Sequence, residues 1–197
     1  MNNIYISSDL HFFHKAILKH TDRPWKTIEE MNEALIDNWN KIVGKGLIYI
    51  LGDLAMISKQ EDGTPVTKMY RRLMARLKGK KCLILGNHDG MSKELYDCFS
   101  EVHNGLLERR ICGERVTMSH YPLLTWEGCA RGSVALHGHS HGRLKYKDDY
   151  IRIDVGVDNW NYSPINYEVL KIDIDNYRKE CYNQGIFKKN SGYEEMD

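Results

Sequence analysis

One stretch decides the fold of this chain: Cys82-Leu83-Ile84-Leu85-Gly86-Asn87-His88-Asp89. Its apolar half indicates a buried strand, and the residues after it carry an amide, an imidazole and a carboxylate. An apolar run followed by a carboxylate occurs twice earlier in the chain. Ile4-Tyr5-Ile6 precedes Asp9, and Leu47-Ile48-Tyr49-Ile50-Leu51 precedes Gly52-Asp53. Helical patterns separate these strands, so we predict a β-α-β-α-β unit with a parallel sheet. Ligands of such sheets bind at the carboxyl ends of the strands.

Three helices are predicted in this first half, over residues 12–20, 28–43 and 65–78. The second begins at a capping box, in which Thr27 and Glu30 satisfy each other's backbone N–H groups. Its apolar residues recur at helical spacing, which predicts one buried face. The third helix opens with a proline in its first turn, where a missing N–H costs nothing.

The second half of the chain shows short strand patterns with few helical stretches between them. They lie near residues 100–103, 105–111, 114–119, 133–137, 151–155 and 167–173. We expect these strands to form a second sheet, mixed or antiparallel, packed on the first. The length fits one domain, which we place at residues 1–182, and we expect residues 183–197 to form a peripheral tail.

Composition bears on which binding partners and which cellular compartment are expected. The chain has 197 residues and a net charge of +1, with 28 basic and 27 acidic side chains in no visible block. It therefore gives no strong support for binding long nucleic acid. Five widely spaced cysteines without a CxxC pair favour a reduced compartment. The sequence shows neither a signal peptide nor an apolar run of the ~20 residues that span a bilayer, so we expect a cytoplasmic protein without a membrane partner.

Metal-binding side chains follow the predicted strand ends. Asp9 and His11 are two residues apart, so both can point to one ion. Asp53 has two carboxylate oxygens and can bridge two ions. Asn87 offers a neutral oxygen, and His88 can give a proton to a leaving oxygen. Carboxylate, imidazole and amide oxygen together suit divalent transition metals.

Two further motifs add imidazole groups. His120 follows the alternating strand at residues 114–119, and His139 and His141 belong to a GHxH motif after the strand at residues 133–137. Each of these motifs is weak alone, because a single histidine is more often a surface or core residue. His14 is near enough to Asp9 and His11 to support the site without binding metal.

The ordered set of DxH, GD, GNHD, H and GHxH resembles the calcineurin-like metallophosphoesterase superfamily. The motifs span residues 9–141 in the family order. The resemblance implies an α/β/β/α sandwich of two mixed sheets flanked by helices, with two metal ions, commonly Mn²⁺, Fe or Zn²⁺. It further implies that Asp53 bridges the ions and that His88 contacts the phosphate. One ion would take Asp9, His11, Asp53 and His141, and the other Asp53, Asn87, His120 and His139.

A looser resemblance links the chain to a compact, uncharacterised bacterial and phage branch of that superfamily. Two segments carry it, Thr21-Asp22-Arg23-Pro24-Trp25 and Asp154-Val155-Gly156-Val157-Asp158-Asn159-Trp160. This branch brings no known substrate with it, so the resemblance implies the fold and the metal site but not a specific reaction.

The leading hypothesis is a metallophosphoesterase in which a bridging hydroxide attacks phosphorus while His88 protonates the leaving group. We expect a phosphodiester, because few cations accompany the motifs, and a phosphorylated small molecule or nucleotide as the substrate. The candidate substrate-binding residues are Arg23, Arg143 and Asn159. A phosphomonoesterase, a nucleotide pyrophosphatase and a non-catalytic metal-binding scaffold for protein partners remain alternatives.

Overall fold

The computed structural model describes residues 3–58, 63–90, 92–145, 150–185 and 187. Its first sheet has the strand order β4-β3-β2-β1-β9, and its second has the order β5-β6-β7-β8. The strands are β1 (Ile4–Ser7), β2 (Leu47–Leu51), β3 (Lys80–Ile84), β4 (Glu101–His103), β5 (Leu106–Ile111), β6 (Glu114–Ser119), β7 (Val134–His137), β8 (Ile151–Asp154) and β9 (Ile165–Asn166). The helices are α1 (Ile17–His20), α2 (Ile28–Ile42), α3 (Val66–Arg76) and α4 (Tyr167–Asn183), with 3₁₀ turns η1 (Lys93–Cys98), η2 (Cys129–Arg131) and η3 (Val157–Asn159).

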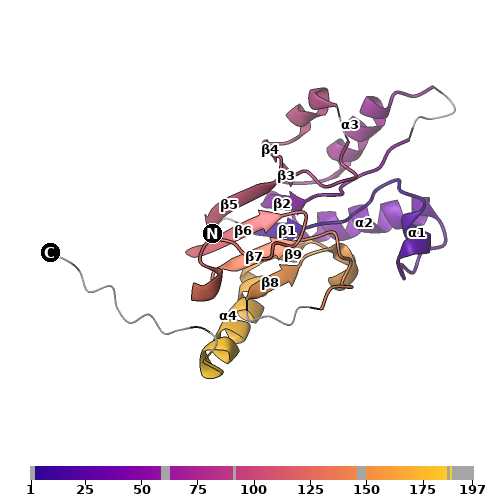
Figure 1. The fold of residues 1–197 in the computed structure, drawn as a ribbon. Helices are drawn as coiled ribbons and strands as arrows, with labels where there is room; N and C mark the ends of the chain where they lie inside the picture. Colours follow the sequence, from indigo (N-terminus) through magenta and orange to yellow (C-terminus); the bar gives the residue numbers. More distant parts are fainter. Residues whose placement is uncertain (1–2, 59–62, 91, 146–149, 186, 188–197) are drawn as a thin grey trace.

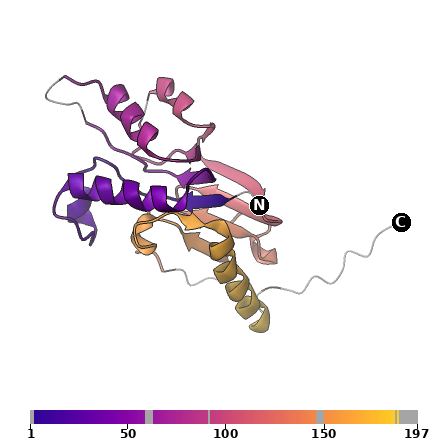
Figure 2. The same cartoon turned by 180° about the vertical axis from the view of Figure 1, so that it is seen from behind.

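The first sheet contains the predicted parallel unit. Strands β1, β2, β3 and β4 run parallel, and β9 adds an antiparallel edge beside β1. Helices α2 and α3 cover its outer face, and the second sheet packs on the opposite face (Figures 1 and 2). The capping box of Thr27 and Glu30 forms as predicted. Because both faces are covered, these strands are largely apolar, and all five residues of β2 are apolar or aromatic.

Alternation along each strand divides the core in two. Ile48 and Ile50 of β2 face α2 and α3, whereas Tyr49 and Leu51 face the second sheet. Neighbouring residues of a strand point to opposite faces, so one short strand supplies both clusters. The second cluster also contains Val116 and other apolar residues of β6, β7 and β8.

The second sheet is mixed, because β5 pairs with β6 antiparallel while β6, β7 and β8 run parallel. Two mixed sheets flanked by helices confirm the predicted fold class. Strand β4 corrects one expectation. It pairs with β3 in the first sheet rather than joining the second.

The segment predicted as a strand at residues 167–173 is instead the start of helix α4. Its buried residues, Tyr167, Leu170 and Ile174, follow helical spacing, and the Asn166 side chain caps the helix by accepting from the Glu168 N–H. Helix α4 contacts β1, β9 and β8 and contributes to the cluster between the sheets.

The helix predicted over residues 12–20 is shorter than expected and begins at Ile17. Phe13 has a φ of 64°, in the left-handed region, so the chain is not helical there. Most of the predicted tail, residues 186 and 188–197, lies outside the described residues. Phe187, within that tail, is buried in the second cluster.

Candidate metal centre

Five loops meet at the carboxyl ends of strands from both sheets. Those after β1, β2 and β3 belong to the first sheet, and those after β6 and β7 to the second. Together they carry the seven predicted metal ligands, and the structure places the side chains of these residues in one connected cluster: Asp9, His11, Asp53, Asn87, His120, His139 and His141.

One part of the cluster consists of Asp9, His11 and His141, whose donor atoms lie within 4.8 Å of one another. Asp9 is fully buried, and both of its carboxylate oxygens accept the backbone N–H of His139, at 3.1 and 2.9 Å. The loop after β7 is thereby fixed on the loop after β1, and the two sheets meet at this contact.

Asp53 lies between the two parts of the cluster. Its Oδ2 is 3.6 Å from Nε2 of His11 and 3.5 Å from Nε2 of His120. Its Oδ1 accepts the backbone N–H of His88 at 2.9 Å. The preceding Gly52 has a φ of 89°, which only glycine adopts readily, and any Cβ there would collide with the His120 ring.

Asn87 connects the other imidazoles. Its Oδ1 is 2.9 Å from Nε2 of His120 and 3.1 Å from Nδ1 of His139. Nδ1 of His120 also forms a hydrogen bond with the carbonyl oxygen of Leu51, at 2.9 Å. An imidazole that donates from Nδ1 carries a lone pair at Nε2. With the Asn87 oxygen in this orientation two lone pairs face one another, an arrangement that a cation between them stabilises.

His11 gives a second indication that the site suits a metal ion. Its Nε2 is buried and has no hydrogen-bond partner among the described residues. The nearest carboxylate oxygens, at 3.6 and 3.9 Å, belong to Asp53 and Asp9 and are too distant for hydrogen bonds. Donor atoms that bind one ion at about 2.0–2.2 Å are themselves about 3–4 Å apart. The residues present therefore fit divalent metal ions.

Backbone strain is concentrated at these loops. The φ angles of Asp9, His11, Asp53, His139 and His141 lie between 48° and 68°, in the left-handed region. Such a conformation costs a non-glycine residue of order 1–3 kcal/mol and is typical of functional sites. The strand ends turn sharply there, which directs successive ligands toward the same point.

Burial shapes the acid–base properties of the first group. It raises the pKa of Asp9 to about 7, and it lowers the pKa of His11 to about 2 with help from nearby Arg23. Burial also lowers the pKa of His141, but the hydrogen bond to Asp158 and the Asp9 carboxylate outweigh it, so the pKa is raised overall. His11 is thus a neutral imidazole near pH 7 and is free to bind metal.

Asp158 is a residue of the site that sequence reasoning missed. Its Oδ2 lies 2.7 Å from Nδ1 of His141, which leaves Nε2 directed at Asp9. Hydrogen bonds of this kind fix the orientation of a metal-binding histidine. Asp158 belongs to the segment at residues 154–160 that carries the looser family resemblance, and that resemblance implies no role for its carboxylate.

The position of Arg23 differs from the prediction that this residue binds substrate. Its side chain is fully buried, and the guanidinium group donates to both oxygens of Asp158 at 2.8 Å. The remaining donors go to the carbonyls of Leu10 and Asp9, at 3.0 and 2.7 Å. Arg23 therefore supports the metal loops from inside the protein.

The other predicted substrate contacts lie at the surface. Arg143 is exposed and donates to the carbonyl of His20, and Asn159 is exposed beside Gly142. Asp89 accepts the backbone N–H groups of Asp53, Leu54 and Gly86 at 2.7–2.9 Å. It ties the loop after β3 to the loop after β2.

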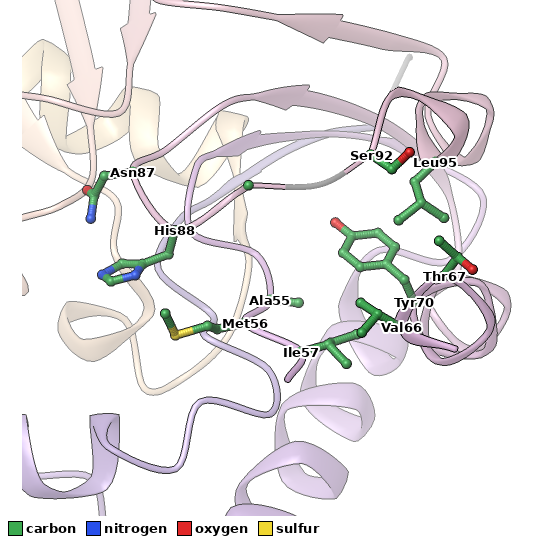
Figure 3. A pocket seen from close by; sticks show the side chains of 11 residues that line it. Ala55, Met56, Ile57, Val66, Thr67, Tyr70, Asn87, His88, Ser92 and Leu95 are labelled. Carbon is green, nitrogen blue, oxygen red and sulfur yellow. The ribbon is translucent and has the colours of Figure 1, made fainter. Parts of the chain in front are cut away.

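Two more histidines complete the surroundings of the centre. Nδ1 of His14 is 3.1 Å from Nδ1 of His11, which agrees with the expected supporting role. His88 is half-buried, and its ring centroid lies 5.4 Å from that of His11. Figure 3 shows His88 and Asn87 at one side of a pocket that extends away from the cluster toward α3.

The chain matches the model of one protein family, described as calcineurin-like phosphoesterase, over residues 3–185. None of the helices in the described part of the chain combines the length and apolarity that a membrane crossing requires. The five cysteines are free.

Similar proteins come from microbes and phages. The uncharacterised protein MJ1445 of Methanocaldococcus jannaschii is 32% identical over 176 residues, covering 86% of this chain and 90% of that protein. The Gene 66 protein of Mycobacterium phage D29 is 27% identical over 188 residues, covering 82% of this chain and 90% of that protein. Among solved structures, AQ665 of Aquifex aeolicus, a protein of unknown function, superimposes with a TM-score of 0.67 at 22% identity, over 87% of this chain and 98% of that one, and shares the fold.

Proposed function

The chain belongs to the calcineurin-like phosphoesterase family, and on that premise we propose that it hydrolyses a phosphodiester with two divalent metal ions. The position of Asp53 carries this proposal. One of its carboxylate oxygens lies 3.6 Å from a nitrogen of His11 and 3.5 Å from a nitrogen of His120. A carboxylate between two imidazoles suits a ligand shared by two ions.

The seven donors divide into two sets around Asp53. In this proposal Asp9, His11, Asp53 and His141 hold one ion, and Asp53, Asn87, His120 and His139 hold the other. When bound, the ions would polarise the phosphoryl oxygens and activate water near neutral pH. We propose Mn²⁺ as the metal, and the same donors also fit Fe and Zn²⁺.

His88 is proposed as the proton donor to the leaving oxygen. Its backbone N–H is bonded to Asp53, and the Asp89 carboxylate holds the loop on either side of it. The ring is only half-buried and lines the adjacent pocket, so a substrate oxygen can reach it. In hydrolysis the oxygen of water forms the new bond to phosphorus, the bond to the alcohol breaks, and the alcohol oxygen takes a proton.

A phosphodiester is favoured over a phosphomonoester because of charge. A monoester dianion carries an additional negative charge that enzymes meet with cationic side chains. Arg23 is buried and bonded to Asp158, and Arg143 donates to a backbone carbonyl. With both arginines engaged within the protein, the singly charged diester of a small molecule or nucleotide is the better match.

Matched kinetics test this function. With Mn²⁺, kcat/KM for bis-p-nitrophenyl phosphate should exceed that for p-nitrophenyl phosphate, and removing the metal should abolish both activities. Asp53→Asn should lose bound metal and activity together, because the shared ligand is weakened. Asp175→Asn, on the surface of α4, is the matched control and should retain both.

Two results would contradict the proposal. A clear preference for the monoester would overturn the assignment of a diester. Absence of hydrolysis of either compound by fully metal-loaded protein would overturn the assignment of a phosphoesterase.

A further inference from the structure

A pocket of about 460 Å³ adjoins the metal cluster, which places it within the usual size range of small-molecule sites. Three parts of the chain enclose it, namely residues 55–57 after β2, the first turns of α3, and the loop that follows β3. Asn87 and His88 belong both to this pocket and to the metal cluster, so a molecule bound at the metals can extend directly into it (Figure 3).

The wall of the pocket is largely apolar. Five of its eleven described lining residues are aliphatic residues or methionine, namely Ala55, Met56, Ile57, Val66 and Leu95. Among the residues that the structure describes, none that lines the pocket is an aspartate, glutamate, lysine or arginine. Such a surface disfavours a charged group and favours an uncharged one that can be removed from water.

One polar group faces this apolar wall without a partner. Tyr70 is only 3% exposed, and its hydroxyl makes no hydrogen bond to any residue that the structure describes. In Figure 3 the ring projects from α3 and carries its oxygen toward the middle of the pocket. Burial raises the pKa of Tyr70, so the hydroxyl stays neutral and able to donate. A buried hydroxyl without a partner is costly, and a ligand that bonds to it recovers that cost.

We propose that this pocket binds the departing alcohol of the substrate when that alcohol carries a flat, uncharged ring of nucleobase size, with the Tyr70 hydroxyl bonded to the ring. The inference rests on the proposed function and adds the substrate class to it. His88, at the mouth of the pocket, is the residue proposed to protonate the leaving oxygen, so the pocket lies on the leaving side. Met56 supplies a polarisable, adaptable contact for a flat ring.

Two substrates that differ only in the alcohol test the proposal. Thymidylyl-(3′→5′)-thymidine and the methyl ester of thymidine 3′-phosphate both yield thymidine 3′-phosphate, with thymidine or methanol as the leaving alcohol. The wild-type protein with Mn²⁺ should show a kcat/KM roughly tenfold or more higher for the dinucleoside compound, because burying a second ring adds binding energy. Product analysis identifies which oxygen departs.

A pair of tyrosine variants provides the matched control. Tyr70→Phe should lower the preference for the dinucleoside compound about three- to tenfold, the range expected for one hydrogen bond. Tyr167 also has a buried hydroxyl without a partner in the described part of the chain, but it belongs to α4 and to the cluster between the sheets. Tyr167→Phe should leave the preference unchanged. Val66→Trp fills the pocket and should raise KM for the dinucleoside compound much more than for the methyl ester.

The outcomes separate this inference from the proposed function. Equal kcat/KM for the two esters, or equal effects of the two tyrosine variants, would overturn the pocket assignment while the phosphodiesterase assignment stands. If bis-p-nitrophenyl phosphate and both thymidine esters are all left intact by metal-loaded protein, the proposed function fails and the pocket assignment fails with it.

Discussion

Asp158 connects the surface of the metal centre to the interior of the protein. It accepts from Nδ1 of His141 on one side and from the guanidinium group of Arg23 on the other. Burial alone would raise the pKa of Asp158, but these two partners hold it well below its ordinary value. The carboxylate therefore stays charged at every physiological pH and keeps the imidazole in one orientation.

Metal affinity should depend on pH through two ligands of one ion. Burial raises the pKa of Asp9, and the bond to Asp158 raises the pKa of His141, so this pair takes up protons as the pH falls below 7 in the metal-free protein. Binding must displace those protons, so affinity for Mn²⁺ should fall about ten- to a hundredfold per pH unit below pH 7. Calorimetry in buffers of different ionisation enthalpy counts the protons released.

Asp158→Asn checks this assignment. Without the carboxylate the pKa of His141 should fall, so fewer protons are released, and affinity should drop about 10–100-fold near neutral pH. Affinity that is independent of pH between 5.5 and 7 would show that neither ligand is protonated there.

His88→Ala separates catalysis from metal binding. Both ions should remain bound, while turnover of a diester with a poor leaving group falls about 10²–10⁴-fold, the range for a lost general acid. Elemental analysis beside kinetics measures both quantities. His103→Ala, a histidine of β4 paired with Glu101, is the control and should change neither. Loss of metal from His88→Ala would show that His88 holds the ions instead.

At the scale of elements, the sequence predicts features that depend on residues close together in the chain. Each of the first three strands is an apolar run followed at once by its ligand, so strand and ligand could be read together. Helix α4 was missed because exposed Val169 and Ile172 give its first turns an alternating pattern typical of strands. The bond between Arg23 and Asp158 joins residues 135 positions apart, and no local pattern shows such a contact.

Because of that bond, replacing Arg23 tests whether the segment before α2 stabilises the site. Arg23→Ala leaves Asp158 half-buried without its cation, and breaking a buried ion pair costs about 3–5 kcal/mol. Urea unfolding of the metal-free protein measures the loss. Arg143→Ala removes an exposed arginine and should change stability by less than about 0.5 kcal/mol. Equal unfolding midpoints for the two variants would contradict the supporting role of Arg23.

For the molecule as a whole, the candidate metal centre is a place where polar groups of the two sheets meet. The loops after β1, β2 and β3 provide one side and those after β6 and β7 the other. Between the sheets lies an apolar cluster, whose packing holds the sheets together but is not directional. The ligands add a directional contact at one end of that cluster.

Removing the metal should therefore loosen both sheets together. At free Mn²⁺ about 100 times the dissociation constant, binding stabilises the folded state by about 2.7 kcal/mol. For a chain of this size that raises Tm by about 5–11 °C. Calorimetric scans with and without chelator measure the shift, and hydrogen exchange should quicken in the loops after β1 and β7 alike. Asp53→Asn should show a smaller shift, and identical Tm values would exclude a structural role for the ions.

The contact between Asp9 and the His139 backbone has a consequence for biosynthesis. These residues touch although they are 130 positions apart in the chain. When only the parallel strands of the first sheet have been synthesised, the nascent chain contains Asp9, His11, Asp53 and Asn87. It does not yet contain the three later imidazoles. In the proposed ligand sets, one ion cannot be enclosed before His139 has emerged and the other cannot be enclosed before His141. If the proposed sites bind metal, metal capture comes late in the maturation of the nascent chain, after its two halves have come together.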